Sequence, residues 1–458
     1  MQESGQLFKT SDTIAAGRIN QLTAKFAEIL VIYRTLEQVG LQHDEGPDVG
    51  GPYGPYIQSQ RLSMYQPYAE QLVKEGKAYY CFCTKERLDS LHQEDGAFGG
   101  YDRHCRDLPE EEVRRLLDAG TPYVIRQKMP TEGTTTFSDA VFGQITVENK
   151  ELDDQILLKS DGFPTYNFAN VIDDHSMHIT HVVRGSEYLS STPKYNLLYE
   201  AFGWDVPVYV HLPLVMGKNP DGTVSKLSKR HGATSFEGLV KEGYLPEAIV
   251  NYIALLGWCP KENRELFTLP ELVEHFSVDG ISKSPAIFDY EKLSWFNGEH
   301  LRLKSPEEFT TLAMPYYRQV FGDKTVDWPV LTGILQPRVV KLNQIPEMLS
   351  FFRELPSYST ELFVNKKSKT NLENSPAMLQ AAIEALEQAQ QWDKTVIHDL
   401  LLELAARLEV KNGTLMWPVR IAASGMTVTP GGAVEILTIL GKEESLRRLR
   451  EGLQKLTV

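Results

Sequence analysis

The hydrophobic pattern of the chain changes character near residue 300. Before that point, short β-rich runs such as residues 123–126, 155–158 and 206–215 alternate with helical stretches and with glycine–proline turns. Strands separated by helices are typical of an α/β body with a mostly parallel sheet. Beyond residue 300, apolar residues recur at the three- and four-residue spacing of amphipathic helices. The sequence therefore predicts an α/β body followed by an all-helical C-terminal domain.

Three local patterns make sharper predictions about individual helices. Ser375 and Pro376 form a favourable helix start, and the apolar residues that follow them share one helical face. Thr395 is expected to cap the next helix. In the first half, Pro67 lies inside the amphipathic run 62–73. We expect this proline to kink the helix or to mark its beginning.

Length, charge and cysteine content narrow the class of protein. The chain has 458 residues, which predicts about three domains at roughly 150 residues each. Its 47 basic and 61 acidic residues give a net charge of −14, so any polyanion must be met by a local basic patch. Four cysteines cannot form a disulfide scaffold and favour a reducing compartment. No apolar run is long enough to span a membrane and no signal peptide is recognisable, so we expect a cytoplasmic protein without membrane contact.

Residues 217–232 carry a concentrated positive charge. From Lys218 to His231 there are three lysines and one arginine against one aspartate, and residues 219–222 predict an exposed turn. Cations in such a loop can surround a triphosphate and stabilise the charge that develops on a leaving pyrophosphate. A solvated basic turn is the alternative, and charge alone favours it.

Several segments of the chain carry a family resemblance. The loop contains Lys226-Leu227-Ser228-Lys229-Arg230, which resembles the K-M-S-K-S loop of class I aminoacyl-tRNA synthetases. Other distinctive segments lie at residues 44–56, 161–175, 179–189, 413–420 and 429–432. Together they resemble the bacterial glutamyl-tRNA synthetases, and the resemblance extends over roughly residues 36–458.

The resemblance implies an activity and a domain plan. The activity is ligation of glutamate to tRNA(Glu) through glutamyl-adenylate, with ATP and Mg²⁺ as cofactors and a monomeric protein. The plan has an incomplete Rossmann-like catalytic domain at residues 1–77 and 151–235 and an inserted connective subdomain at residues 78–150. A helical stem-contact region then covers residues 236–305, and a helical anticodon-binding domain covers residues 306–458.

The resemblance also implies roles for single residues. In the loop, the catalytic residues would be Lys226, Ser228, Lys229 and Arg230, of which Lys226 and Lys229 would contact ATP. The residues that would bind glutamate are Tyr166, Asn170, Arg184 and Glu187. Arg184 would pair with a carboxylate, for which a guanidinium fork is well suited. An ordinary core aromatic at position 166 and a surface ion pair at position 184 are the structural alternatives.

The family's first strand and its H-x-G-H helix have no counterpart in this sequence. None of the eleven histidines stands in that motif, and the segment that begins at Asp44 arrives tens of residues early. We therefore expect this chain alone to activate glutamate poorly or not at all. A non-catalytic tRNA-binding remnant of the same family is the alternative function, and an unrelated nucleotidyltransferase would explain only the lysine loop.

Three cysteines in residues 78–150 predict a zinc site. Cys81, Cys83 and Cys105 could supply thiolates, and some family members have a fourth ligand at the position of Asp107. His92 and His104 are physical alternatives for that fourth ligand. Packing of the three thiols without zinc is the alternative to the whole site.

Two basic segments are candidates for contact with RNA phosphates. The first is Lys366-Lys367-Ser368-Lys369, and the second is the last helical stretch, with Lys442, Arg447, Arg448, Arg450 and Lys455. For each segment a solvated helix face is an equally good explanation.

Overall fold

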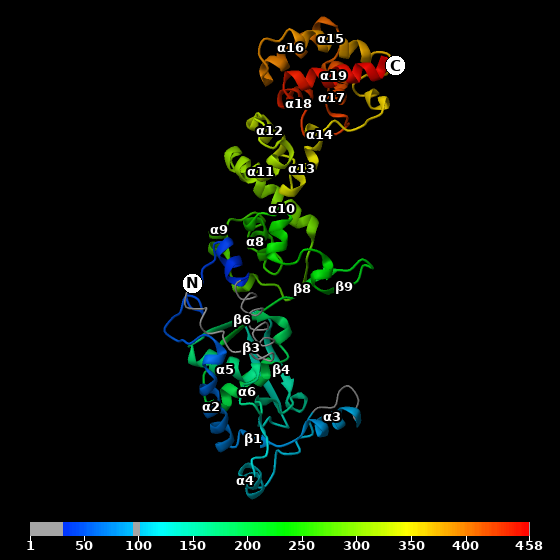
Figure 1. The fold of residues 1–458 in the computed structure, drawn as a ribbon. Coiled ribbons are helices and arrows are strands. Elements are labelled where there is room, and N and C mark those ends of the chain that lie inside the picture. The colour runs from blue at the N-terminus through cyan, green and yellow to red at the C-terminus, as the bar shows by residue number, and fades with distance from the viewer. Residues whose placement is uncertain (1–30, 95–100, 458) are drawn as a thin grey trace, which may run out of the picture. The chain divides into compact units, whose positions relative to one another are not determined.

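The computed structural model describes residues 31–94 and 101–457. By its internal contacts the chain divides into two units. The first comprises Met1–Lys226, Ala254–Arg264 and Pro270–Phe288, and the second comprises Leu227–Ile253, Glu265–Leu269 and Asp289–Val458. The ribbon in Figure 1 shows strands in the first unit and helices throughout the second.

A four-stranded mixed sheet lies at the centre of the first unit. Its order is β4-β3-β7-β6, in which β6 and β3 run parallel to β7 and β3 and β4 form an antiparallel hairpin. Helices α5 and α6 pack against each other through a shared apolar core that includes Phe168 and Leu198. The elements are β3 (Thr134–Asp139), β4 (Gly143–Glu148), α5 (Tyr166–Ser176), β6 (His181–Gly185), α6 (Thr192–Phe202) and β7 (Val208–Leu212).

Two smaller sheets complete the first unit. In the antiparallel sheet β1-β2-β5, helix α2 packs on β1, and Tyr65 and Leu72 of that helix are fully buried. In the third sheet, β8 pairs parallel with β10 and antiparallel with β9. The elements are α2 (Leu62–Lys74), β1 (Ala78–Cys81), α3 (Lys85–Glu94), α4 (Glu110–Asp118), β2 (Val124–Gln127), β5 (Ile156–Leu158), β8 (Val215–Lys218), β9 (Val224–Lys226) and β10 (Ala286–Ile287).

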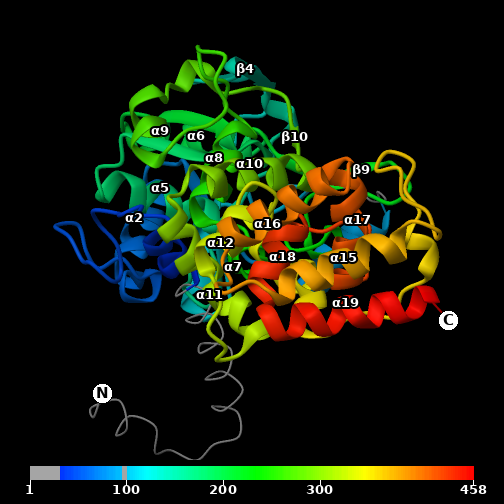
Figure 2. The same cartoon turned by 90° about the horizontal axis from the view of Figure 1, so that it is seen from above.

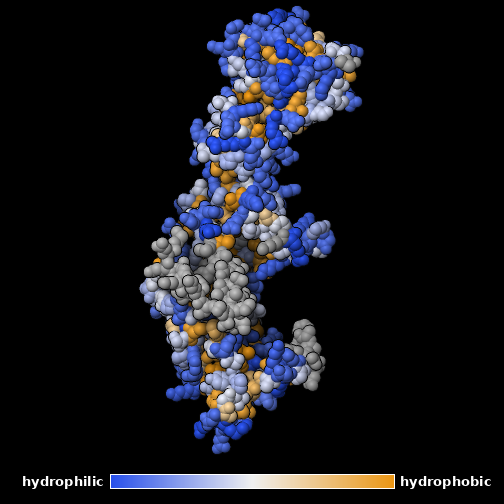
Figure 3. Space-filling model, in the orientation of Figure 1, coloured by the Kyte–Doolittle hydropathy of each residue, from blue (hydrophilic) through white to orange (hydrophobic). Residues whose placement is uncertain are grey.

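The second unit is built from helices around one apolar core that extends from Leu245 to Leu449. Its last five helices, α15 to α19, lie side by side in both ribbon views (Figures 1 and 2). On the face seen in Figure 3, hydrophilic side chains predominate over these helices, with hydrophobic ones between them. The helices from α7 onward, of which α9 lies mostly in the first unit, are α7 (Phe236–Lys241), α8 (Pro246–Leu255), α9 (Leu269–His275), α10 (Tyr290–Leu303), α11 (Pro306–Phe321), α12 (Trp328–Leu335), α13 (Ile345–Met348), α14 (Ser350–Arg353), α15 (Ser375–Glu387), α16 (Lys394–Arg407), α17 (Asn412–Ser424), α18 (Ala433–Leu440) and α19 (Lys442–Thr457).

The predicted α/β body with a helical C-terminal region is confirmed. Helix α15 begins at Ser375 as expected. The cap of α16 is Asp393 instead of Thr395, because the Asp393 carboxylate accepts a hydrogen bond from the Val396 amide at 2.9 Å. Pro67 lies inside α2 and does not mark its beginning, since the helix starts at Leu62.

The hairpin β3–β4 falls within the predicted insertion at residues 78–150, yet β3 pairs with β7 of the central sheet. These residues therefore share a sheet with the strands that we assign to the catalytic body. The finer division into four parts stays a prediction. Among the described residues, no helix is both long enough and apolar enough to cross a membrane.

Candidate functional site

Arg184 lies near the end of β6, beside His211 of the neighbouring strand β7 in parallel register. Its Nε donates to His211 Nε2 at 3.2 Å, and its Nη2 donates to Thr192 Oγ1 at 3.1 Å. Arginine has five N–H donors. Within the described parts of the chain no further hydrogen bond to Arg184 is found, so both Nη1 donors and one Nη2 donor are available to a ligand.

Three tyrosine rings surround this guanidinium. Its Cζ lies 4.6 Å from the ring centroid of Tyr195, 5.2 Å from Tyr188 and 5.7 Å from Tyr209. Rings at these distances attract a cation and restrict the water that reaches it. We call these three rings the tyrosine cage. They keep the Arg184 guanidinium in a partly desolvated environment, where it would bind a carboxylate strongly.

Helix α5 brings two of the predicted glutamate-binding residues to this cage. The ring of Tyr166 lies 5.9 Å from that of Tyr188, and its side chain is exposed. Asn170 follows one turn later, and its Oδ1 is buried without a hydrogen-bond partner in the described structure, as is the hydroxyl of Tyr209. Leaving a buried polar atom unpaired costs about 1–3 kcal/mol. Unpaired buried oxygens of this kind are typical of a binding site in which a polar ligand supplies the missing hydrogen bonds.

Glu187 connects Arg184 with the lysine loop. It belongs to the short 3₁₀ turn Ser186–Tyr188 that follows β6, and its Oε1 lies 3.1 Å from Nζ of Lys226 at the end of β9. Its own backbone amide, and then Lys226, hold the pKa of the Glu187 carboxyl below its usual value. A Cβ at position 185 would overlap this carboxylate, so any residue other than Gly185 would require the Glu187 side chain to move. The structure therefore brings Lys226 to the edge of the sheet that carries Arg184.

The remainder of the predicted loop is a hairpin followed by a short turn. Between β8 and β9, residues 219–223 form the predicted tight turn, in which the Asn219 amide donates to the Thr223 carbonyl at 2.8 Å. Ser228 donates its amide hydrogen to His231 Nδ1 at 3.0 Å. Leu227, Ser228 and the exposed Arg230 belong to the second unit. The side chain of Lys229 lies outside the described part of the structure.

Two adjacent aspartates at the end of α5 have opposite environments. Asp173 accepts a hydrogen bond from Nε of the buried Arg61 at 2.8 Å and from the Tyr65 hydroxyl at 2.9 Å. Among the described residues Asp174 has no such partner, and burial raises the pKa of its carboxyl to about 6, although Arg184 acts in the opposite direction. Asp174 therefore contributes a second acidic group to the surroundings of Arg184.

Cys81, Cys83 and Cys105 come together as predicted. Their sulfur atoms all lie within 4.8 Å of one another, and Sγ of Cys83 and Sγ of Cys105 are 3.6 Å apart. Tetrahedral zinc with Zn–S bonds of about 2.3 Å holds its sulfurs about 3.8 Å apart. The Tyr101 hydroxyl lies 3.2 Å from Cys81 Sγ and 3.7 Å from Cys83 Sγ. The hydrogen bond between Cys105 and Cys81 lowers the pKa of the Cys81 thiol and raises the pKa of the Cys105 thiol, so one thiolate is stabilised within the cluster.

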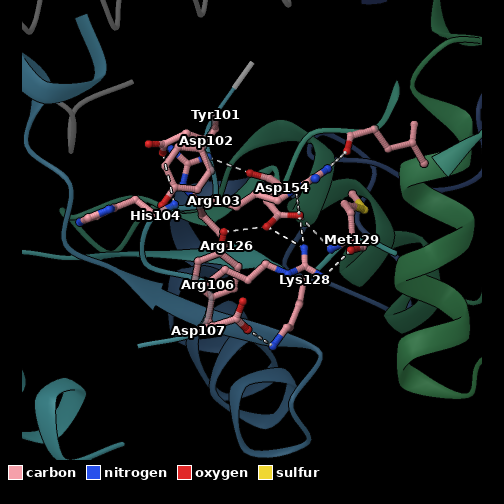
Figure 4. A network of polar contacts seen from close by, with 12 residues as sticks. Tyr101, Asp102, Arg103, His104, Arg106, Asp107, Arg126, Lys128, Met129 and Asp154 are labelled. Carbon is pink, nitrogen blue, oxygen red and sulfur yellow. Dashed lines mark hydrogen bonds and ion pairs between the residues drawn. The ribbon is translucent and has the colours of Figure 1, made fainter. Parts of the chain in front are cut away.

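Asp107 is not part of this cluster. Its side chain is 80% exposed, and Oδ1 lies 3.1 Å from Nζ of Lys128. Figure 4 shows this pair beside a network in which the buried carboxylate of Asp154 accepts hydrogen bonds from Arg106 at 2.8 and 2.9 Å. The oxygen that stands next to the thiols is that of Tyr101, which residue spacing alone did not single out.

One of the cations that the sequence suggested for RNA on the last helix is buried. Arg448 is 1% exposed, and its Nη1 donates to the carbonyls of Phe351 and Ala423 at 2.7 and 2.9 Å. The prediction that Arg448 contacts RNA is therefore wrong, because this arginine satisfies carbonyls inside the helical core. The neighbouring cations have intramolecular partners as well, namely Glu444 and Glu451 for Arg447, Glu387 for Arg450, the carbonyls of Glu387 and Ala389 for Lys442, and the Tyr358 ring for Lys455.

The other basic segment forms a turn that hydrogen bonds hold in place, which we call the lysine turn (residues 366–369). Asn365 and Thr370 close it with two backbone hydrogen bonds of 3.0 and 3.1 Å. The hydroxyl of Thr414, near the start of α17, donates to the Ser368 carbonyl at 2.7 Å. All three lysines of the turn are exposed, and the described residues provide no ion-pair partner for them.

Comparisons with known proteins agree over most of the chain. Residues 20–295 match the family described as tRNA synthetases class I (E and Q), catalytic domain, and residues 307–453 match an anticodon binding domain. Glutamate--tRNA ligases of Clostridium tetani and Clostridium kluyveri are each 55% identical over 429 residues, which cover 93% of this chain and 87% of theirs. The crystal structure of a glutamate tRNA ligase from Elizabethkingia meningosepticum, in complex with its amino acid, superposes with a TM-score of 0.82 at 35% identity. The match covers 93% of this chain and 89% of that one.

The match to a catalytic domain does not favour the alternative of a non-catalytic remnant. The expectation about the missing first strand and H-x-G-H helix concerns mainly residues 1–30, which lie outside the described structure. Sequence reasoning also overlooked two residues of the site, His211 and Thr192, which hydrogen-bond Arg184. A histidine within the apolar run 206–215 was the available signal, since histidine is seldom fully buried without a specific partner.

Proposed function

The chain belongs to the class I tRNA synthetase family for glutamate and glutamine, and we propose that it works as a glutamate--tRNA ligase. In the first step a carboxylate oxygen of glutamate attacks the α-phosphorus of ATP, and pyrophosphate leaves. In the second, a ribose hydroxyl of the terminal adenosine of tRNA attacks the glutamyl carbonyl, and AMP leaves. One observation supports this proposal most directly: Lys226 pairs with Glu187, which lies in the turn that follows β6, three residues after Arg184.

The amino acid would be held by the cage around Arg184. The three available N–H groups of its guanidinium can bind a carboxylate bidentately. Asn170 and Tyr166, one turn apart on α5, would add polar contacts, and the unpartnered Oδ1 of Asn170 supports this role. The positive charge of Arg184, which a carboxylate ligand would meet here, supports a preference for an acidic amino acid.

The lysine loop would act on the phosphates. Lys226 and Lys229 would contact ATP, with Ser228 and Arg230 completing the catalytic set. Lys226 rests on Glu187 in this structure at 3.1 Å, and both groups are exposed enough for the pair to exchange for a phosphate at little cost. Mg²⁺ bound to ATP would neutralise the phosphate oxygens. The lysines would stabilise the charge that grows on pyrophosphate as it leaves.

We infer a structural zinc site at Cys81, Cys83 and Cys105. The sulfur spacing supports it, and three thiolates are among the ligands that zinc prefers. For the fourth position the neighbouring Tyr101 hydroxyl is better placed than Asp107, which pairs with Lys128. When bound, zinc would cross-link β1 to the segment around Cys105 and so stabilise this part of the first unit.

We propose tRNA(Glu) as the partner and the lysine turn as one of its phosphate contacts. The three lysines are exposed and held on a turn that backbone hydrogen bonds fix. Fixed cations lose less freedom on binding than flexible ones. We further propose that the protein works as a monomer in the cytoplasm.

Aminoacylation with radiolabelled glutamate tests the function. We expect tRNA to acquire glutamate through an alkali-labile ester, with dependence on ATP. Binding of tRNA without any ester formation would instead support the non-catalytic alternative.

A further inference from the structure

A buried histidine–aspartate pair lies directly behind Arg184. Nδ1 of His211 is 2.6 Å from Oδ2 of Asp139, and neither side chain is exposed to solvent. Asp139 is the last residue of β3, His211 lies in β7, and Arg184 pairs with His211 from β6. Three adjacent strands thus each contribute one polar group, and the groups form a continuous line from the sheet interior to the cage.

The hydrogen bonds of Asp139 decide which nitrogen of His211 carries the proton. Its Oδ1 accepts from the amides of Val141 and Phe142 at 2.9 and 2.8 Å, and its Oδ2 accepts from the backbone amide of His211 at 3.2 Å. A carboxylate that accepts all these bonds is ionised and has no hydrogen to donate. The remaining bond therefore requires His211 to donate from Nδ1.

The other nitrogen of His211 must then be an acceptor. Nε2 faces Nε of Arg184 at 3.2 Å, and arginine offers only donors. If Nε2 were also protonated, its N–H would face the Nε–H of Arg184, and the charged imidazolium would lie against the charged guanidinium. Burial holds the pKa of His211 below its ordinary value, in agreement with a neutral ring. The imidazole therefore presents a lone pair to Arg184.

We propose that Asp139 and His211 are positioning residues that orient Arg184 toward its substrate. With Nε fixed on His211 and one Nη2 hydrogen on Thr192, the free Nη1–Nη2 edge of the guanidinium can point in only one direction. Glutamate would then meet a fork that is already oriented, and no binding energy is lost in ordering it. This inference rests on the proposed role of Arg184 in glutamate binding.

Substitutions at His211 separate positioning from simple core packing. His211→Gln places an amide oxygen near the position of Nε2 and keeps an acceptor for Arg184. His211→Asn fills the Nδ1 side and removes that acceptor. Loss of a hydrogen bond to a charged group corresponds to about 10- to 100-fold in affinity. We expect His211→Asn to raise the glutamate dissociation constant by this factor and His211→Gln to restore most of the affinity.

Asp139→Asn tests the proton assignment itself. The amides of Val141 and Phe142 keep the oxygen of the new side chain on their side, so its NH₂ group faces His211. Nδ1 would then have to accept, and the hydrogen would move to Nε2 against Arg184. ¹⁵N NMR of histidine-labelled protein should show a non-protonated Nε2 in His211 of the parent chain and a non-protonated Nδ1 in the variant.

Calorimetric titration of the full chain with glutamate, and separately with ATP, gives the decisive comparison. The inference predicts weaker glutamate binding in His211→Asn, near-parental binding in His211→Gln, and unchanged ATP binding in both. Equal glutamate affinities in the two variants, or a protonated Nε2 in the parent chain, would overturn it. If Arg184→Gln also leaves glutamate binding intact, the proposed role of Arg184 fails as well. If only that variant loses binding, the positioning inference alone fails.

Discussion

Nζ of Lys226 lies 3.1 Å from Oε1 of Glu187. This contact joins the first lysine of the basic loop to the turn that directly follows the strand of Arg184. Since Glu187 is only three residues from Arg184, a single carboxylate connects the group proposed for ATP with the group proposed for the amino acid. The two halves of the expected chemistry therefore come from two sheets, and the Lys226–Glu187 pair brings the end of β9 to the turn that follows β6.

Removal of the Lys226 ammonium should affect chemistry much more than stability. In Lys226→Ala we expect tRNA-dependent pyrophosphate exchange to fall by about 10- to 1,000-fold, because the variant has no cation aimed at the leaving group. The melting temperature should change little, because an exposed ion pair contributes about 0–1 kcal/mol. Lys218→Ala in the same hairpin is the matched control. Equal exchange rates in the two variants would contradict the role of Lys226.

The adjacent aspartates 173 and 174 should respond to neutral substitution in opposite directions. Burial raises the pKa of folded Asp174 to about 6, so its charged form is penalised in the fold above that pH. Asp174→Asn should therefore stabilise the protein by about 2–3 kcal/mol at pH 8. The gain should shrink as the pH falls below 6 and vanish below about pH 3, where the folded and the unfolded carboxyl are both protonated.

Asp173→Asn is the comparison for that experiment. It removes the carboxylate that Arg61, with a side chain only 2% exposed, holds at 2.8 Å. An unpaired buried guanidinium should destabilise the protein by about 3 kcal/mol. Denaturant unfolding at several pH values measures both variants. A destabilised Asp174→Asn protein at pH 8 would show that this carboxylate has a partner that offsets its burial.

The lysine turn should contribute to tRNA binding through charge alone. Replacement of Lys366, Lys367 and Lys369 by alanine should weaken tRNA binding and reduce the slope of log K against log salt. The reduction should be up to about 0.7–0.9 for each phosphate that the turn no longer neutralises. The control replaces Arg447 and Arg450 of α19, which already pair with glutamates. Filter binding over a range of salt concentrations measures both. An unchanged salt slope in the lysine variant would exclude the turn from the RNA interface.

The three-cysteine cluster should contain one zinc ion. Metal analysis of protein purified without chelators is expected to give about one equivalent, and Cys105→Ser should lower it strongly because one thiolate is removed. Chelation should loosen the segment around β1, which hydrogen exchange can follow. Cys259→Ser, at an exposed cysteine outside the cluster, is the control. Less than about a tenth of an equivalent in the parent chain would refute the site.

Periodicity and short motifs predicted the parts of this protein that depend on local sequence. The α/β body, the helical second half, the start of α15 and the turn at residues 219–222 all follow from spacing, proline and turn residues. The cap of α16 was misplaced by two residues, because Asp393 and Thr395 are both good caps and only the tertiary fold selects between them.

Contacts between distant segments were harder to predict. Arg448 looked like one of several surface cations, but it packs inward because uncapped carbonyls of Phe351 and Ala423 lie beneath it. Asp139 and His211 are 72 residues apart and meet only because β3 and β7 are neighbours. A single sequence contains no signal for such a pairing, whereas the role of Arg184 is predicted from a family motif that includes it.

Glutamate binding by Arg184 is the central claim, and one measurement tests it most directly. Glutamate-dependent pyrophosphate exchange, with ATP and tRNA present, can be compared between the parent chain and Arg184→Gln. The account predicts an apparent glutamate affinity at least about 100-fold weaker in the variant, since the substrate carboxylate has no charged partner there, with the ATP dependence unchanged. An unaltered glutamate dependence would show that the amino acid binds elsewhere.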